Sequence, residues 1–246
     1  MKKVLVVALT LAMAVCALTG CGKKSANFEK SEGVMTYDEY VAAPLDSEVT
    51  IEAFVQGNQS WWDNTITLYT QDDKGGYFIY SMPCSEEDAK KILPGTKVKV
   101  TGTKSEWSGE VEIVDATAVE IYDIDKGWAT FDAKDVTKDL ADEAKLKESM
   151  NQFVAFKGLT VEAADDNGAA FLYNWDGSGS QGDDLYFNVS DGNNTYSFTV
   201  ESYLCDSSTD VYKAVEALNV GDKIDCEGFL YWYEGANPHI TKVTVK

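Results

Sequence analysis

The chain shows the same succession of hydrophobic and polar positions twice, and this pattern predicts its fold. Between residues 49 and 55 every second side chain is valine, isoleucine or alanine, which is the period of two expected of a strand with one buried face. Residues 66–69 predict a second strand and residues 76–81 a third, with turn residues at 72–76 between them.

A helix is expected after the third strand. Ser85 can cap it, and Asp88 follows at the capping-box spacing. Ile92 and Leu93 would face inward, and Pro94 ends the helix. Two further strands, at residues 98–100 and 111–121, complete the first half.

The second half repeats this order. Three strands are expected at residues 154–158, 185–189 and 196–200. A helix should follow, since Ser207 and Asp210 have the capping-box spacing. Its inward face would carry Val211, Val215 and Leu218. The half ends with a strand at residues 220–228 and a last strand that begins near His239.

Single positions also correspond between the halves. Gly95, Lys97 and Gly102 of the first half match Gly221, Lys223 and Gly228 of the second. Cys84 and Cys205 both precede the expected helix, and a tryptophan follows each fourth strand at nearly the same distance. An internal duplication explains these matches.

Three strands, a helix and two strands form the order of the five-stranded OB barrel. On this order, and on the shared motif of the fourth strand, the chain resembles bacterial lipoproteins built from tandem OB-like domains over residues 35–246. The resemblance implies a mostly β fold of two consecutive five-stranded OB-like barrels, each with a helix between strands 3 and 4. It implies little about function. An immunoglobulin-like sandwich is the alternative, but it does not predict a helix at the same place in both halves.

The pattern divides the chain into two domains and a linker. Residues 35–122 are expected to form OB-like domain 1 and residues 152–246 OB-like domain 2. Residues 123–151 would be a linker with a short amphipathic helix at 139–150. The inward side chains of that helix would be Leu140, Ala144 and either Leu146 or Met150.

The N-terminus has the features of an exported lipoprotein. Two lysines precede an apolar run at residues 4–18, which suits a secretory signal and is too short for a comfortable membrane span. The run ends at residues 18–21 in Leu-Thr-Gly-Cys, which resembles a bacterial lipobox. That resemblance implies a signal peptide over residues 1–20 and lipidation of Cys21. An ordinary export signal with an incidental cysteine is the alternative.

The region after Cys21 predicts how the protein is held at a membrane. Residues 21–34 are mostly small and polar, which indicates a flexible tether. No later segment has the ~20 apolar residues that span a bilayer. The resemblance to a lipobox therefore implies an extracytoplasmic location at a bacterial membrane, with the membrane contacted through a lipid anchor of at least two palmitate-type chains.

The charge of the chain disfavours nucleic acid as a partner. All 21 basic residues are lysine, against 41 acidic residues, so the formal net charge is −20 at pH 7. The chain lacks the arginine fork that binds phosphates and guanine edges, and it lacks a positive surface. A glycan or a protein or peptide ligand fits this charge better.

Residues suited to catalysis are few. His239 is the single histidine, and no serine or cysteine nucleophile can be assigned to it. A carboxylate pair that hydrolyses an envelope polymer is the alternative, but nothing singles out such a pair among the acids. The sequence thus predicts a non-catalytic binding or scaffold protein that needs no cofactor.

Aromatic residues gather in the loops that flank the usual OB cleft. The candidates for ligand binding are Trp61, Trp62 and Trp107 in the first half, and Trp175, Tyr231, Trp232 and Tyr233 in the second. Exposed rings stack on sugars, bases or peptides, although the same rings could cover the barrel ends or hold the domains together. Neighbouring side chains on an extended segment face opposite sides, so at least one of Trp61 and Trp62 is expected to be exposed near Trp107.

One loop of the second half has a partial metal-binding pattern. Asn174, Asp176 and Ser178 place oxygen atoms at positions 1, 3 and 5 of an EF-hand-like loop. Leu185 stands at position 12, where that loop needs a glutamate. A surface loop without a metal is the better interpretation.

Three cysteines belong to the folded part of the chain, namely Cys84, Cys205 and Cys226. Export permits a disulfide, and Cys205 with Cys226 is the candidate pair. Cys226 alternates with Ile224 on an inward strand face, which favours a buried thiol that packs as a small hydrophobic side chain.

Overall fold

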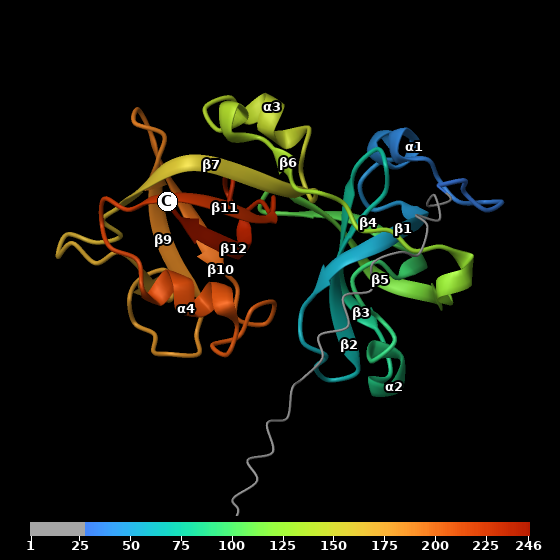
Figure 1. Ribbon diagram of the computed structural model, residues 1–246. Coiled ribbons are helices and arrows are strands. Elements are labelled where there is room, and N and C mark those ends of the chain that lie inside the picture. The colour runs from blue at the N-terminus through green and yellow to red at the C-terminus, as the bar shows by residue number, and fades with distance from the viewer. Residues whose placement is uncertain (1–27) are drawn as a thin grey trace, which may run out of the picture.

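The computed structural model describes residues 28–246 as two β-barrels that lie side by side (Figure 1). The expected signal peptide, Cys21 and the first half of the tether fall in residues 1–27 and so lie outside the described residues. Within residues 28–246, no helix is both long enough and apolar enough to cross a membrane.

Barrel 1 is a closed ring of five strands in the order β1-β2-β3-β5-β4. The strands are β1 (Glu48–Asn58), β2 (Thr65–Gln71), β3 (Gly76–Pro83), β4 (Lys97–Trp107) and β5 (Glu110–Ile121). Helix α2 (Glu86–Ala89) lies between β3 and β4 and begins at the N-cap Ser85. This is the order predicted for an OB barrel.

Both faces of β1 are buried, which goes beyond the predicted alternation. Ile51 and Val55 point into the barrel core, as expected from the period of two. Phe54, on the opposite face, is also buried, and the ring of Phe28 packs edge-on against it with centroids 5.6 Å apart. The segment that precedes the first helix therefore covers the outside of this strand.

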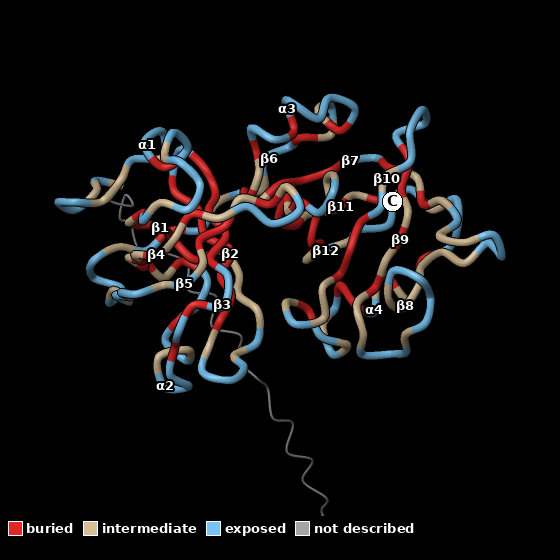
Figure 2. Tube along the Cα trace, turned by 180° about the vertical axis from the view of Figure 1, so that it is seen from behind, coloured by how far each residue is buried: buried red, intermediate tan, exposed pale blue. Residues whose placement is uncertain are grey.

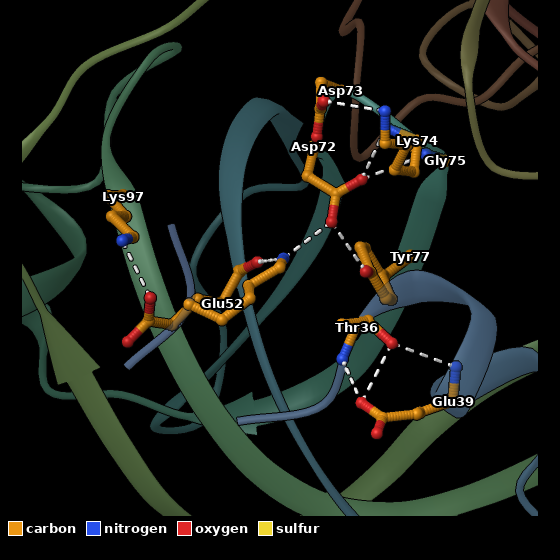
Figure 3. Close-up of polar contacts among 10 residues, drawn as sticks. Thr36, Glu39, Glu52, Asp72, Asp73, Lys74, Gly75, Tyr77 and Lys97 are labelled. Atoms are coloured by element: carbon orange, nitrogen blue, oxygen red, sulfur yellow. Dashed lines mark hydrogen bonds and ion pairs between the residues drawn. The ribbon is translucent and has the colours of Figure 1, made fainter. Parts of the chain in front are cut away.

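An ion pair and hydrogen bonds to buried carboxylates fasten this covering segment to barrel 1. The ammonium of Lys30 lies 2.6 Å from a carboxylate oxygen of Asp72, which also accepts a hydrogen bond from the Tyr77 hydroxyl at 2.8 Å. Glu52, on β1, accepts a hydrogen bond from the hydroxyl of Ser31 in the covering segment and is also paired with Lys97 of β4 at 2.7 Å (Figure 3). Because these carboxylates are buried, their partners are needed to offset the loss of hydration.

Helix α1 (Tyr37–Ala42) was not predicted from the sequence. It begins with a capping box, in which Thr36 Oγ1 accepts from the Glu39 amide and Glu39 Oε2 accepts from the Thr36 amide (Figure 3). At its C-terminal end the ammonium of Lys104 donates to the carbonyls of Tyr40, Val41 and Ala43 at 2.8–2.9 Å. A cation at this end is favourable because the last carbonyls of a helix lack partners.

Barrel 2 is built in the same way as barrel 1. Its strands are β7 (Phe153–Glu162), β9 (Leu185–Ser190), β10 (Thr195–Val200), β11 (Lys223–Phe229) and β12 (His239–Val245). They follow the order β7-β11-β12-β10-β9, and the pairing of β7 with β9 closes the ring. The short strands β6 (Lys134–Asp135) and β8 (Leu172–Tyr173) add to this sheet.

Helix α4 (Asp210–Glu216) lies between β10 and β11, so each barrel has its predicted helix. The two helices lie at the same end of the molecule (Figures 1 and 2). Gly95 and Gly221, which follow them, have nearly the same φ, 98° and 95°. Since this conformation is unfavourable for other residues, the matched glycines preserve one turn in both halves.

Two details of these helices were predicted wrongly. Leu93 is exposed, while Ile92 is buried as expected, because α2 ends at Ala89 and these two residues follow it outside the helix. The N-cap of α4 is Thr209 and not Ser207, and Thr209 Oγ1 accepts from the Tyr212 amide. The inward positions Val211 and Val215 are buried as predicted.

The segment between the barrels contains four short elements. They are η1 (Ile124–Lys126), β6, η2 (Thr137–Asp139) and α3 (Glu143–Lys147). Leu140 and Leu146 are buried in the core of barrel 2, as predicted. Ala144 is exposed, contrary to the prediction, because only one side of this five-residue helix contacts the barrel.

Candidate binding site

The outer face of β2 and β3 in barrel 1 is covered by barrel 2. Tyr69 and Phe78 point out of barrel 1, yet both are buried. Phe229 stacks on Tyr69 with centroids 4.4 Å apart, and Tyr231 packs edge-on against Phe78 at 5.2 Å. An OB barrel commonly binds its ligand on this face and in the adjoining loops. In barrel 1 the face is therefore used to dock the second barrel.

His239 lies inside this junction. Its Nδ1 is 2.6 Å from the hydroxyl of Tyr69, and the ring of Tyr231 stacks on it at 4.3 Å. Burial lowers the pKa of His239 to about 3. The imidazole is thus neutral at physiological pH and serves as a packed hydrogen-bonding group between the barrels.

Trp107 and Tyr233 form an exposed pair of rings at the edge of the junction, and we call this pair the aromatic platform. Trp107 is 53% exposed and Tyr233 is 44% exposed, and their centroids lie 5.1 Å apart. Trp107 ends β4 of barrel 1, while Tyr233 belongs to the corresponding loop of barrel 2. The two halves of the duplication thus each contribute one ring.

Backbone hydrogen bonds hold the two loops of the aromatic platform together. The amide of Glu234 donates to the carbonyl of Ser108 at 2.8 Å. The amide of Trp232 donates to Glu110 Oε2 at 2.9 Å. Burial raises the pKa of the Glu110 carboxyl to about 8, so this acceptor is largely uncharged at pH 7. The platform is consequently anchored without a buried net charge.

Gly109 permits the close approach of the loops. It has a φ of 96°, and a Cβ atom there would lie 2.7 Å from Cδ1 of Trp232. Any other residue would meet both backbone strain and a clash. The ring beneath it, Trp232, is only 2% exposed and lies under the ammonium of Lys147, 4.7 Å from the ring centroid.

The seven aromatic candidates therefore separate into four groups. Trp232 is buried in the core of barrel 2, which corrects its prediction as a ligand contact, while the half-buried Tyr231 packs against His239 in the junction. Trp61 is half-buried, and its Nε1 donates to the carbonyl of Cys84 at 2.8 Å. Trp107 and Tyr233 make the aromatic platform. The remaining two, Trp62 and Trp175, are isolated and exposed.

The expected exposure of Trp61 or Trp62 is confirmed, but its expected position is wrong. Trp62 is 74% exposed, as the alternation of side chains requires. Trp62 follows the end of β1, which lies beside the start of β4 because Phe54 pairs with Lys97. Trp107, by contrast, stands at the far end of β4. The rings of Trp62 and Trp107 are thus not in contact and do not form one cleft.

Tyr69, Phe78 and Phe229 were not singled out from the sequence. Each is an aromatic residue at a strand position that should face solvent in an isolated barrel. An aromatic side chain among the polar, outward-facing positions of a strand indicates that this face of the sheet is covered. That signal was available in β2 and β3, but it does not say what covers the face.

The loop with the partial EF-hand pattern closes on itself. Asp176 Oδ1 accepts from the Ser178 amide at 3.0 Å, and a carboxylate of Asp183 accepts from the Ser180 amide at 2.9 Å. Across residues 28–246, no group of three or more His, Cys, Asp or Glu side chains could hold a metal ion.

The three cysteines of the described chain are free and buried. The candidate disulfide between Cys205 and Cys226 is therefore absent, and each thiol packs in the core of barrel 2. Burial raises the pKa of Cys205 to about 12 and raises that of Cys226 as well. Such thiols are uncharged and unreactive at neutral pH.

Comparison with known proteins gives weak structural similarity. No protein-family model and no curated protein matches the chain. The hypothetical protein ygiW from E. coli has 16% identity over 36% of this chain and 89% of that chain, with a TM-score of 0.26. The p204 HINb domain has 11% identity over 79% of this chain and 95% of that chain, with a TM-score of 0.35.

A murine DNA-binding protein bound to double-stranded DNA has 13% identity over 80% of this chain and 96% of that chain, also with a TM-score of 0.35. Scores this low carry no functional argument. The assignment of two tandem OB-like barrels rests on the strand order and on the closed pairing of each ring.

Proposed function

We propose that this protein is a lipid-anchored extracytoplasmic binding protein that holds a glycan on the aromatic platform without a catalytic step. The observation that carries the proposal is the exposed pair of Trp107 and Tyr233, which is supplied by both barrels and fixed by backbone hydrogen bonds. Rings held in this way keep an apolar surface in water, and exposed apolar surface commonly marks a binding site.

A glycan suits this surface better than nucleic acid does. The faces of Trp and Tyr match the apolar faces of sugar rings, and both residues also offer a polar atom. The loops beside the platform contribute carboxylates and carbonyls, for example Glu106 and Glu234, which accept bonds from sugar hydroxyls. Phosphate backbones would instead be repelled by the net charge of −20.

Anchoring by lipid belongs to the same proposal and has its own test. The segment that ends in Cys21 resembles a lipobox, so Cys21→Ser should abolish fatty-acid incorporation. Cells grown with a tagged fatty acid would show label on the original chain only. Undiminished label on the variant would contradict lipid anchoring at Cys21 but would not affect the proposal of glycan binding.

The binding test uses soluble peptidoglycan fragments and chito-oligosaccharides. Trp107→Ala and Tyr233→Ala should each weaken binding about 5- to 150-fold, by the ~1–3 kcal/mol typical of stacking on an aromatic ring. Trp175→Ala is the matched control, because that ring is 76% exposed and the described rings in contact with Trp107 and Tyr233 do not include it. Titration calorimetry together with thermal melts separates lost binding from lost folding.

Two results would count against the proposal. Equal affinity in Trp107→Ala, Tyr233→Ala and the original chain would remove the platform as the binding site. Release of new reducing ends from the glycan, stopped by replacing a carboxylate, would indicate a hydrolase instead.

A further inference from the structure

A groove runs along barrel 1 between β3 and β5, far from the contacts of the aromatic platform. It is open to solvent and has a volume of about 820 Å³. One wall is made by the end of β3 and by α2, with Cys84, Asp88 and Lys91. The other wall is the end of β5, with Val119, Glu120 and Asp123 close by. We call it the β3–β5 groove.

The groove exists because β3 and β5 separate after a short pairing. They pair in parallel only at Phe78 with Glu112 and at Ile79 with Ile113. Residues 114–121 of β5 continue along β4 on one edge, but no described strand pairs with their other edge. A strand edge without a partner is a ready template for an added strand.

The register of β4 and β5 identifies the groups on the open edge. The amide of Tyr122 donates to the carbonyl of Lys97 at 3.0 Å, so these two residues form a hydrogen-bonded pair. Because such pairs alternate in an antiparallel ladder, the N–H and C=O groups of Val119 and Ile121 point away from β4. They point into the β3–β5 groove, which both residues line.

The groove is negatively charged, and its lining also includes the apolar side chains of Pro83, Val119 and Ile121. Lys91 supplies the only ammonium among the lining residues, and this group lies 2.7 Å from Asp88 Oδ1 and 3.7 Å from Glu87 Oε1 of α2. No ion pair within residues 28–246 involves Glu120 or Asp123, and Val119 is an exposed valine at the same wall. A segment with basic and apolar side chains would complement both properties.

We propose that the β3–β5 groove binds an extended protein segment with alternating basic and apolar side chains, which adds as a strand to the free edge of β5. Main-chain hydrogen bonds to Val119 and Ile121 supply the affinity. Ionic contacts with Glu120 and Asp123 supply the preference for lysine or arginine. This site is independent of the glycan-binding proposal.

The test uses the full chain and a labelled nine-residue peptide of alternating lysine and valine, with binding followed by fluorescence anisotropy. A peptide of alternating glutamate and valine is the charge control. The lysine–valine peptide with N-methyl groups at alternate residues is the backbone control. We expect the lysine–valine peptide to bind, the glutamate–valine peptide not to bind, and N-methylation to weaken binding at least about tenfold.

Matched variants place the site on the protein. Glu120→Lys should weaken the lysine–valine peptide about fivefold, through one lost attraction and one new repulsion. Asp166→Lys makes the same change of charge on an exposed loop of barrel 2 and should have no effect. Val119→Pro removes an amide of the open edge and should abolish binding, while the melting temperature shows whether barrel 1 is intact.

Several outcomes would overturn the inference. These are no binding of the lysine–valine peptide, equal binding of its N-methylated form, or equal loss of affinity in Glu120→Lys and Asp166→Lys. Trp107→Ala should leave peptide binding unchanged, so failure here and failure of the glycan proposal are distinguishable.

Discussion

At the scale of single residues, the junction of the barrels depends on polar groups that the fold keeps uncharged. Glu110 is fully buried and His239 nearly so, and burial shifts both pKa values toward the neutral form. Each group then acts as a hydrogen-bonding partner, Glu110 for the Trp232 amide and His239 for the Tyr69 hydroxyl. Neutral partners avoid the cost of desolvating a charge.

This predicts a dependence of stability on pH. The pKa of Glu110 is about 8 in the fold, above its ordinary 4.5, so the fold holds the proton more tightly than the unfolded chain. The contribution of Glu110 to stability is therefore lost as pH rises from about 4.5 to 8. Glu110→Gln should become more stable relative to the original chain over this window, by up to ~1.4 kcal/mol for each pH unit above about 4.5.

Denaturant unfolding at pH 5, 6.5 and 8 measures this difference. Comparing the variant with the original chain cancels the contributions of other titrating groups, such as His239 and Glu201. A difference in unfolding free energy that stays constant between pH 5 and 8 would contradict the account of Glu110.

Two tryptophans predicted as equivalent from the sequence should behave in opposite ways. Trp232 is 2% exposed and packs in the core of barrel 2, so Trp232→Ala should cost ~3–5 kcal/mol of stability. Trp175 is exposed, and Trp175→Ala should change stability by less than ~0.5 kcal/mol. Thermal melts decide the matter, and a similar loss in both variants would refute the assignment of Trp232 to the core.

At the scale of elements, the repeated pattern was sufficient to predict the strand order and both barrel helices. Where hydrophobic and polar side chains alternate strongly, as in β1 and β9, the pattern determines which side chains enter the barrel core, whatever packs on the outer face. Helix α1 was missed because its six residues carry too little periodicity, although Thr36 and Glu39 are a visible capping signal. Boundaries and inward positions of short helices, such as Leu93 and Ala144, depend on contacts outside the element.

The segment before α1 shows how tertiary contacts override local pattern. The sequence indicates a tether there, yet Lys30 is paired with the buried Asp72. Lys30→Ala should lower stability by ~1–3 kcal/mol, because it leaves that carboxylate without its cation. Lys74→Ala is the matched control, since Lys74 pairs with Asp73 at the surface and should contribute less than ~1 kcal/mol. Equal losses, read from denaturant melts, would show that the pair at Lys30 has no special role.

At the scale of the whole molecule, the barrels are joined through a face that could have bound a ligand. Tyr69 and Phe78 pack against barrel 2. In this arrangement the loop after β4 and the loop after β11 meet at the surface. The sequence predicted Trp107 and Tyr233 separately as ligand contacts, but it could not pair them. The two rings are close because of the way the barrels dock. The docking depends on the interface between the barrels, which the hydrophobic pattern within each strand does not encode.

The most direct test of the central proposal is a double-mutant cycle on Trp107 and Tyr233, measured as the binding free energy of a peptidoglycan fragment. If the two rings form one platform, the ligand contacts both, and the effects of Trp107→Ala and Tyr233→Ala should be coupled by ~0.5–3 kcal/mol. The double variant should then lose clearly less binding energy than the sum of the single variants. Strictly additive losses, or an unchanged affinity in all three variants, would contradict a shared platform.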